Sequence, residues 1–427
     1  MNRFFIVVFA VVLGSYTASA QQYDVLEQVA NDWRKMSAME GPHRFDGTDI
    51  SKAPKGYEPV YISHYGRHGS RYASSSSTYV KLQEILSDGH NARVLTDIGE
   101  QFFDLFKDFV DTPLTNTGDI VPLGFEQHKM ISDIVYDNFA KVFADGRKVN
   151  AISSTSQRCI VSMASFCANL KGRNPGIDLF MDSNHALMTI VAPPSAPSAL
   201  RRNFVGPKEP TGLESVESFG RRIVDLDALN ARLFKVPTFI DNYEGGIYAF
   251  SKVLFSFLTG YRNYCDEPIF DFVLTKEQMV TLWEANNFDS FTYDTEARYR
   301  MIPLLEDIIA KADVALGDPS IAADLRFGHD YIAEAFTCLI NANSVGTIPS
   351  RADEVKEWFQ SYNICMATTL LFVFYKNKAG DVIFKLVWNE HDANLPQLTP
   401  VTGCYYRWSD FKTWAAGLLA EHPEIIS

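Results

Sequence analysis

The sequence is poor in basic residues and has no long apolar run beyond its N-terminus. Lys and Arg together number 39 against 52 Asp and Glu, which gives a net charge of −13. A nucleic-acid-binding protein is expected to show the opposite balance, so we exclude that class. Hydrophobic residues make up 46% and charged residues 21% of the chain. This composition excludes a disordered, collagenous or coiled-coil protein and predicts a globular one.

Cysteine is also scarce, and its spacing excludes the common metal sites. The sequence contains no CxxC pair and no Cys/His cluster with metal-ligand spacing. An exported chain can oxidise its cysteines, but spacing alone does not choose among the pairings. We therefore expect buried thiols or one to two structural disulfides among the six cysteines, which are Cys159, Cys167, Cys265, Cys338, Cys365 and Cys404.

The first 20 residues have the pattern of an export signal. Arg3 precedes an apolar run from Phe4 to Leu13, and small residues end in Ala18-Ser19-Ala20. A run of ten apolar residues is too short to cross about 30 Å of hydrocarbon as a helix. Cleavage after Ala20 would leave Gln21 as the N-terminus. We expect a soluble protein that is exported to the periplasm or secreted, with no membrane span.

The pattern of strands and helices predicts an α/β fold. Strands are expected at 57–63 and 148–152, and each is followed by a loop and a helix, at 74–86 and 154–170. A further helix is expected over 124–144. Strand–loop–helix units of this kind favour a mostly parallel sheet flanked by helices. Near the C-terminus, strong strand runs at 368–375 and 382–388 are separated by a turn and predict a hairpin.

A mainly α-helical cap is expected to interrupt this α/β core. Several prolines follow residue 193, and the next hundred or so residues carry helical stretches, such as 275–285 and 295–316, with few strand signals. The expected division is a signal peptide at 1–20, the first part of the core at 21–190, the helical cap at 191–317 and the second part of the core at 318–427.

One loop concentrates groups that bind anions. Arg67, His68 and Arg71 follow the first predicted strand, with glycines at 66 and 69. Ligands bind beyond the carboxyl ends of the strands in open α/β sheets, and a following helix N-terminus favours an anion. The two arginines suit phosphoryl oxygens, and a neutral His68 could attack phosphorus. Two alternatives are a zinc pair of His64 with His68, which the glycines disfavour, and a solvated basic loop.

Further motifs show a resemblance to the histidine acid phosphatases, the second branch of the histidine phosphatase superfamily. Arg67–Arg71 resembles their RHGxR signature, and Arg326–Asp330 resembles their late Gly-His-Asp motif. Between these, Gly118–Gly124 resembles the G-x-L-T-P-L-G segment, and Ser153–Arg158 with Ser162 resembles the segment of a second phosphate-binding arginine. Val382–Glu390 resembles their terminal strand. The similarity covers residues 57 to 390, weakly through the helical middle.

The resemblance implies a metal-independent phosphomonoesterase without a cofactor. Fixed cations stabilise a transferring phosphoryl group, so the arginines would supply the charge. Ala73 and Val121 stand where the family usually has Pro and Thr, which weakens the assignment to a subfamily more than the reaction. The implied roles are nucleophile for His68, phosphate binding for Arg67, Arg71, Arg158 and His329, and general acid for Asp330.

The resemblance implies that the substrate is a small phosphate ester, and the family includes phytases and multiple inositol-polyphosphate phosphatases. Residues 147–202 carry seven Lys/Arg against two Asp/Glu, whereas 191–314 carry 13 against 18. Asp330 stands in a position where the multiple inositol-polyphosphate phosphatases commonly have Ala, which favours an Asp-type acid as in phytases. We favour inositol polyphosphates. The alternatives are a broad acid or sugar-phosphate phosphatase and a secreted protein that binds phosphate esters without turnover.

Some residues outside the motifs are weaker candidates for substrate binding. Arg201 and Arg202 lie where the cap is expected to begin, and His185 is either a residue of the core–cap edge or part of the pocket. His43-Arg44 is expected to be a solvated or edge feature, with contact to the substrate as the alternative. His391-Asp392 is a rival His-Asp pair, but it lacks the preceding glycine. The sequence does not predict the oligomeric state.

Overall fold

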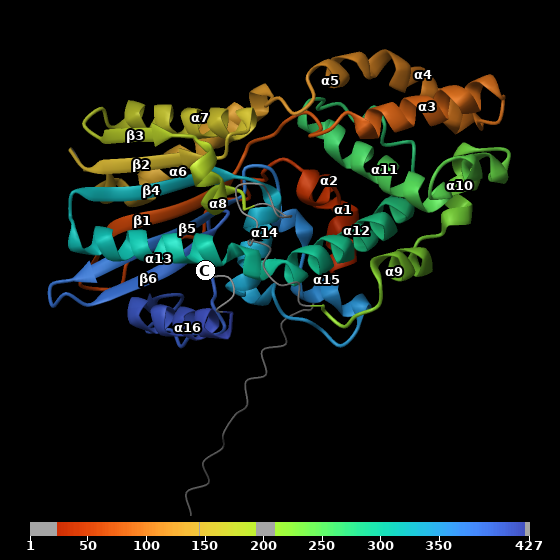
Figure 1. The fold of residues 1–427 in the computed structure, drawn as a ribbon. Coiled ribbons are helices and arrows are strands. Elements are labelled where there is room, and N and C mark those ends of the chain that lie inside the picture. The colour runs from red at the N-terminus through yellow and green to blue at the C-terminus, as the bar shows by residue number, and fades with distance from the viewer. Residues whose placement is uncertain (1–23, 145, 194–209, 423–427) are drawn as a thin grey trace, which may run out of the picture.

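The computed structural model describes residues 24–144, 146–193 and 210–422, in which one mixed sheet lies beside a body of helices (Figure 1). This arrangement confirms the predicted fold class, an α/β sheet flanked by helices with a mainly helical second part. The expected signal peptide, Arg201 and Arg202 lie outside the described residues. Within them, no helix is both long and apolar enough to span a membrane.

The sheet has a parallel half and an antiparallel half. Its order is β3-β2-β4-β1-β5-β6-β7, with β8 paired to β6. The strands from β3 to β1 are parallel, and those from β5 onward are antiparallel. The predicted hairpin is confirmed as β5 and β6. The bounds are β1 (Tyr57–Arg67), β2 (Lys148–Ser153), β3 (Asp178–Asp182), β4 (Ile321–Gly328), β5 (Thr369–Asn377), β6 (Val382–Trp388), β7 (His391–Ala393) and β8 (Tyr406–Arg407).

Helices cover both faces of the sheet and form the second body. The predicted helix over 295–316 is interrupted, because residues 298–301 form a 3-10 turn and Pro303 lies in the first turn of the next helix. The bounds are α1 (Val25–Asn31), α2 (Trp33–Met36), α3 (Ser77–Asn91), α4 (Asp97–Phe109), α5 (Asp111–Thr115), α6 (Pro122–Phe139), α7 (Gln157–Arg173), α8 (Met188–Val191), α9 (Val216–Ile223), α10 (Leu226–Leu233), α11 (Gly246–Gly260), α12 (Lys276–Glu296), α13 (Ile302–Gly317), α14 (Asp330–Leu339), α15 (Val355–Trp358) and α16 (Trp408–Glu421).

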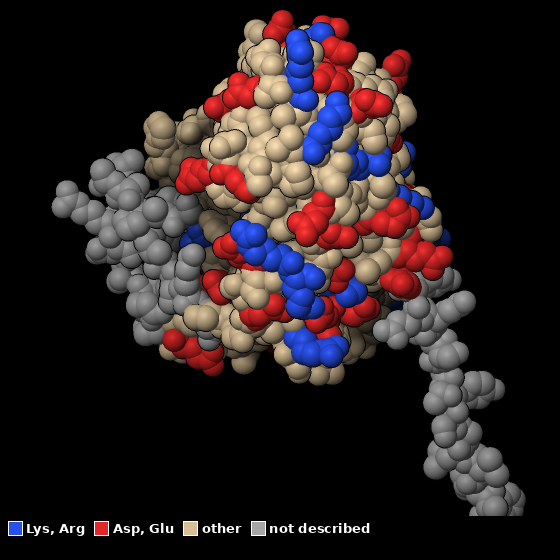
Figure 2. Space-filling model, turned by 90° about the vertical axis from the view of Figure 1, so that its right-hand side faces the viewer, with Lys and Arg blue, Asp and Glu red and all other residues tan. Residues whose placement is uncertain are grey.

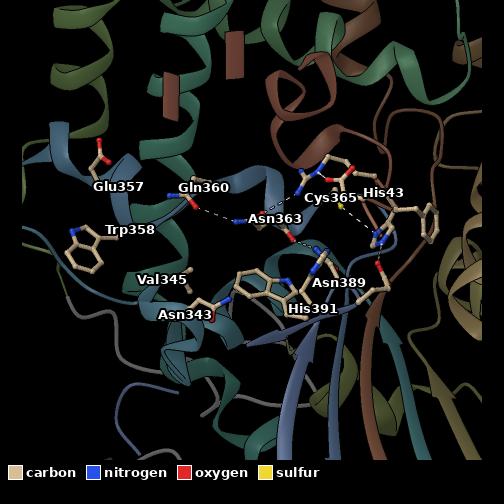
Figure 3. A pocket seen from close by; sticks show the side chains of 15 residues that line it. His43, Asn343, Val345, Glu357, Trp358, Gln360, Asn363, Cys365, Asn389 and His391 are labelled. Atoms are coloured by element: carbon tan, nitrogen blue, oxygen red, sulfur yellow. Dashed lines mark hydrogen bonds and ion pairs between the residues drawn. The ribbon is translucent and has the colours of Figure 1, made fainter. Parts of the chain in front are cut away.

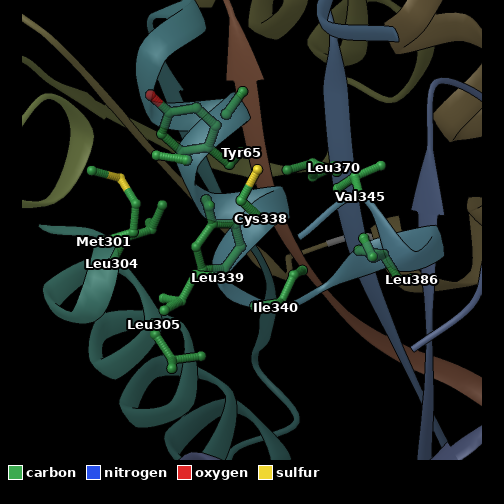
Figure 4. Close-up of a cluster of buried hydrophobic side chains, with 14 of the residues drawn as sticks. Tyr65, Met301, Leu304, Leu305, Cys338, Leu339, Ile340, Val345, Leu370 and Leu386 are labelled. Atoms are coloured by element: carbon green, nitrogen blue, oxygen red, sulfur yellow. The ribbon is translucent and has the colours of Figure 1, made fainter. Parts of the chain in front are cut away.

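Alternation along the central strands creates two hydrophobic cores. Successive side chains of a strand point to opposite faces, so Tyr61 and Tyr65 lie on one face of β1 and Ile62 on the other. The first face packs against α13, α14 and α16, and Figure 4 shows Tyr65, Leu304 and Leu339 among the side chains of this cluster. The second face packs against α6 and α7. Both faces of the central strands are therefore buried, as their apolar sequences require.

The helical body has its own core, rich in aromatic side chains. Residues of α3 and α4 pack there with residues of α10, α11 and α12, although α3 and α4 precede the predicted cap in the sequence. The domain boundaries given above remain a prediction. On the face shown in Figure 2, acidic and basic side chains are interspersed without a field of one sign. The helix α14 contacts both β1 and α12, so it lies between the sheet and the helical body (Figure 1).

Candidate active site

Strands β1 and β4 are parallel and end at the same edge of the sheet, where the anion-binding loop follows β1. Strand β1 extends beyond its predicted end to Arg67, so the loop begins at His68. The His68 N–H donates to Gly328 O at the end of β4, at 3.0 Å, and its carbonyl accepts from Ala367 N–H at 2.9 Å. The first residue of the loop is thus fixed by the end of β4 and by the segment that precedes β5, at the place where open α/β sheets bind ligands.

The rest of the loop is held by α6 and α7. Gly69 N–H donates to Ser162 Oγ at 3.0 Å, and Ser70 N–H donates to Gln127 Oε1 at 2.8 Å. A Cβ on Gly69 would lie 2.5 Å from the Gly124 carbonyl oxygen, so only glycine fits there. The motifs around residues 118–124 and 162 therefore position the loop. Gln127 was not singled out in the sequence, where a glutamine in a helix carries no signal.

The His68 side chain has the tautomer and charge of a nucleophile. Its Nδ1 lies 3.0 Å from Gly69 O, and a carbonyl can only accept, so Nδ1 carries the proton. Its Nε2 is then left with the lone pair. Burial, followed by the charges of Arg71, Arg67 and Arg158, holds the pKa of His68 well below its usual value. The imidazole is neutral, as attack on phosphorus requires.

Three arginines surround His68 with donors that the described residues do not satisfy. Arg67 donates to Ile364 O at 2.7 Å and to Asp330 Oδ2 at 2.7 Å. Arg71 donates to Tyr72 O at 3.0 Å. The buried Nε of each of Arg67, Arg71 and Arg158 has no hydrogen-bond partner among the described residues. Because an unpaired buried donor costs about 1–3 kcal/mol, this arrangement favours binding of an anion with several oxygens.

His329 and Asp330 come from the junction of β4 and α14. His329 Nε2 lies 2.9 Å from Ser154 Oγ, and Arg158 donates to its Nδ1 at 3.5 Å. Burial and Arg158 lower the pKa of His329 to about 4, so it is neutral. Burial would raise the pKa of Asp330, but Arg67 and Arg71 together hold it well below its usual value. Asp330 is therefore a carboxylate paired with Arg67.

A small polar cavity adjoins Arg71 on the side of the helical body. Its volume is about 200 Å³, and its lining includes Glu40, Arg71 and the hydroxyl-bearing residues Ser74, Ser75 and Ser77. Glu40 Oε2 lies 3.7 Å from Arg71 Nη1. Hydroxyl groups beside an arginine can donate to further oxygens of a ligand held by the loop. Glu40 was missed in the sequence, because no spacing connects the N-terminal segment with Arg71.

The other candidates differ in their surroundings. His185 is exposed at the start of a 3-10 turn, His185–Leu187. His391 is exposed on β7, and Asp392 pairs with Lys385 at 2.8 Å, so neither is part of the arginine-rich site. His64 lies on the α6 and α7 face beside Phe166 and Phe327, which does not support a zinc pair with His68.

One further expectation is wrong, and the structure decides between the two alternatives for the cysteines. His43 is buried, with 7% exposure, because its imidazole pairs with Glu390, so it is not a solvated or edge feature. The expected alternative of structural disulfides also fails. All six cysteines are free thiols, of which four are buried and Cys265 and Cys404 are partly exposed.

Comparisons with solved structures identify the fold. A multiple inositol polyphosphate phosphatase of Bifidobacterium longum, in complex with inositol hexasulfate, aligns with a TM-score of 0.74 at 18% identity, over 91% of this chain and 98% of that chain. A phytase of D. castellii aligns with a TM-score of 0.65 at 15% identity, over 96% and 90%. This chain has the histidine acid phosphatase fold.

The same fold is found in a more distant structure. A Hafnia alvei phytase in complex with myo-inositol hexakis sulphate aligns with a TM-score of 0.54 at 13% identity, over 86% of this chain and 98% of that chain. No protein-family model and no curated protein sequence matches the chain. The histidine acid phosphatase fold thus extends over nearly the whole length, although the sequence identity to these structures is only 13% to 18%.

Proposed function

We propose that this protein is an exported phosphomonoesterase that works through a phosphohistidine intermediate and removes phosphate from inositol polyphosphates. The observation that carries the proposal is the neutral His68, with Nε2 unprotonated, among three arginines whose buried Nε–H groups lack partners. A phosphoryl group supplies the several acceptor oxygens that such donors require. The fold, shared with phytases and an inositol polyphosphate phosphatase, supports the same reaction.

The first step transfers the phosphoryl group to His68. The lone pair of Nε2 attacks phosphorus, and the bond between phosphorus and the leaving oxygen breaks. Arg67, Arg71 and Arg158 stabilise the charge on the equatorial oxygens, and His329 adds a further contact. Asp330 donates its proton to the leaving alkoxide, which would otherwise be a poor leaving group. The fixed cations make a metal ion or cofactor unnecessary.

In the second step water attacks the phosphohistidine. Asp330, now a carboxylate, accepts a proton from this water, and the bond between phosphorus and Nε2 breaks. Inorganic phosphate leaves, and His68 and Asp330 return to their starting protonation states. The same carboxyl group thus serves as acid and then as base, which requires that it titrate during each turnover.

Asp330 must be protonated before the first step, although Arg67 and Arg71 hold it ionised without a ligand. A bound phosphoryl dianion occupies these guanidinium groups and adds negative charge beside the carboxylate. Both effects raise the pKa of Asp330 in the complex, since nearby negative charge disfavours ionisation. We therefore expect activity to fall on the alkaline side as this carboxyl group loses its proton.

Inositol polyphosphates are favoured over simpler esters by the surroundings of the loop. The cavity beside Arg71 offers hydroxyl donors next to the reacting centre, where a second phosphate of the same substrate could bind. Of the basic stretch 147–202, Arg158 lies in the site, but Arg147 binds backbone carbonyls at the starts of β1 and β4, at the opposite edge of the sheet, and Arg173 pairs with Asp133 and Asp137. Arg201, Arg202 and His185 remain candidates for binding of remote phosphates. A broad acid or sugar-phosphate phosphatase would need none of these groups.

The proposal is tested by phosphate release from phytate, glucose 1-phosphate and p-nitrophenyl phosphate at acidic pH. We expect all three to be hydrolysed and phytate to have the highest kcat/KM. His68→Ala should abolish release from all three, whereas His90→Gln, at an exposed histidine, should not change it. A purified wild-type protein that binds phytate but releases no phosphate would establish the non-catalytic alternative. Equal kcat/KM for the three esters would establish a broad phosphatase.

A further inference from the structure

A second polar cavity, of about 340 Å³, opens where β6 ends, and no residue of the proposed reaction lines it. Figure 3 shows Cys365 and His43 pointing toward each other at one side of this cavity. The lining includes a thiol, an imidazole and a carboxylate together, contributed by Cys365, His43 and Glu390. These three residues come from segments more than 20 residues apart in the sequence, so only the fold brings them together.

The three side chains form a chain of hydrogen bonds. Cys365 Sγ lies 3.7 Å from His43 Nδ1, and His43 Nε2 lies 2.6 Å from Glu390 Oε2. A nucleophile beside a base that a third group orients is the arrangement that activates thiols in proteins. The thiol and the carboxylate occupy opposite edges of the imidazole. They therefore cannot converge on one metal ion, and the cluster is not a metal site.

The charges of the cluster set Cys365 apart from the other cysteines. Burial would raise the pKa of the Cys365 thiol, but His43 lowers it below its usual value. Burial likewise opposes ionisation of His43, but Cys365 and Glu390 raise its pKa to about 10. Burial raises the pKa of each of the other five cysteines. Cys365 is thus the thiol that most readily becomes a thiolate, which is the reactive form.

The backbone around the cluster is held in unusual conformations. Ala367, Asn389 and Glu390 have φ angles of 59°, 47° and 64°, in the left-handed region that non-glycine residues rarely adopt. Such strain costs about 1–3 kcal/mol at each residue and tends to occur at functional sites. Glu390 also retains one carboxylate oxygen, Oε1, that is buried without a partner among the described residues. The strained turn thus holds the Glu390 carboxylate against His43, which binds only one of its two oxygens.

We propose that Cys365 is a modification site, a nucleophilic thiol that reacts with small hydroperoxides entering this cavity. The thiolate sulfur attacks the hydroxyl oxygen of the peroxide, and the O–O bond breaks. Sulfur gains the hydroxyl group and becomes a sulfenic acid, oxidised by two electrons. The alkoxide or hydroxide that leaves takes the proton of the His43 imidazolium, so the peroxide is reduced to an alcohol or water.

The surrounding backbone does not favour the acyl-transfer chemistry that Cys-His pairs perform in hydrolases. The N–H groups of Met366, Ala367 and Thr368 donate to Gly41 O, His68 O and Cys365 O respectively. None of these three is free to stabilise an oxyanion beside the sulfur. Oxidation needs no oxyanion hole, because its leaving group is an oxygen that takes its proton from His43.

Oxidation of Cys365 should also change the structure of the arginine-rich site. Arg67 donates to Ile364 O, the carbonyl next to Cys365, at 2.7 Å, and Ala367 N–H donates to His68 O at 2.9 Å. A larger group on the sulfur displaces the segment 364–367 and therefore shifts both Arg67 and His68. This consequence rests on the proposed phosphatase function, whereas the reaction of the thiol does not.

The site is tested by treating the native protein with limiting hydrogen peroxide, trapping sulfenic acid with dimedone and mapping the modified peptides by mass. We expect Cys365 to react first, at least tenfold faster than the more exposed Cys265 and Cys404. His43→Gln and Glu390→Gln should each slow Cys365 at least tenfold and leave the rate at Cys265 unchanged. First modification at Cys265 or Cys404, or an unchanged rate at Cys365 in both variants, would overturn the proposal.

The coupling is tested with p-nitrophenyl phosphate on the same samples. Peroxide should inactivate the wild type and the matched control Cys404→Ser in parallel with the labelling of Cys365, and leave Cys365→Ser active. If Cys365 is labelled and the phosphatase activity stays complete, the coupling is overturned, but the proposal that Cys365 is a reactive thiol stands. A protein without any phosphatase activity would overturn the proposed function, while the labelling result still decides the site.

Discussion

Two buried histidines beneath the anion-binding loop should make the protein lose stability in acid. His64 on β1 and His128 on α6 are both fully buried. Burial, together with His128 and Arg326, lowers the pKa of His64 to about 3, and burial with His43 lowers that of His128 to about 3. Both imidazoles therefore stay neutral in the folded protein at pH values where an unfolded chain protonates them.

The sign and size follow from proton linkage. A folded pKa below the unfolded value of 6.5 contributes stability that is present above pH 6.5 and is lost as the pH falls toward 3. Between these pH values each histidine lowers the free energy of unfolding by about 1.4 kcal/mol for every pH unit that the pH falls. From pH 6.5 to 4.5 the loss is about 2.7 kcal/mol for one histidine and about 5 kcal/mol for the pair.

The assay is equilibrium unfolding in urea at pH 7 and pH 4.5. His64→Leu keeps a side chain of similar volume between Phe166 and Phe327 but cannot titrate. Both proteins should lose free energy of unfolding between pH 7 and pH 4.5. We expect the loss in His64→Leu to be smaller than the loss in the wild type by about 2.7 kcal/mol. The matched control is His90→Gln, which removes an exposed histidine. The reasoning is refuted if His64→Leu and the wild type lose the same free energy in acid.

Three further predictions concern the arginine-rich site. Asp330→Asn should lower kcat for phytate by about 10²- to 10⁴-fold and affect p-nitrophenyl phosphate far less, since an aryl oxide leaves with little protonation; equal losses in steady-state assays would show that Asp330 is not chiefly the acid. Activity should survive exhaustive chelation and be inhibited by vanadate, so loss with chelator and return with one divalent ion would contradict the mechanism. Gly69→Ala should lower kcat by about 10²-fold, because its Cβ would lie 2.5 Å from Gly124 O and displace the loop, whereas Gly172→Ala, where a Cβ meets nothing within 4 Å, should leave kcat unchanged.

The fold class and the segments that carry the chemistry could be predicted from local sequence patterns alone. Alternating and continuous apolar runs are local properties, so the hairpin of β5 and β6 and the strands β1 and β2 could be predicted from them. The ends of the strands were predicted less accurately. Local patterns assign the polar residues after residue 63 to a loop, but β1 continues through them to Arg67. The motif residues could be found because RHGxR and Gly-His-Asp each lie within a few consecutive positions.

Only the tertiary structure decided which distant residues meet. The sequence could not place Gln127 against Ser70, Glu40 against Arg71 or Glu390 against His43, because each pair is joined through the packing of separate elements. Protonation states depend on the same packing. His43 and His64 are the same residue type, yet a carboxylate and a thiol raise the pKa of one while burial lowers that of the other. Burial and neighbouring charge belong to the folded chain, and they separate an imidazolium from a neutral imidazole here.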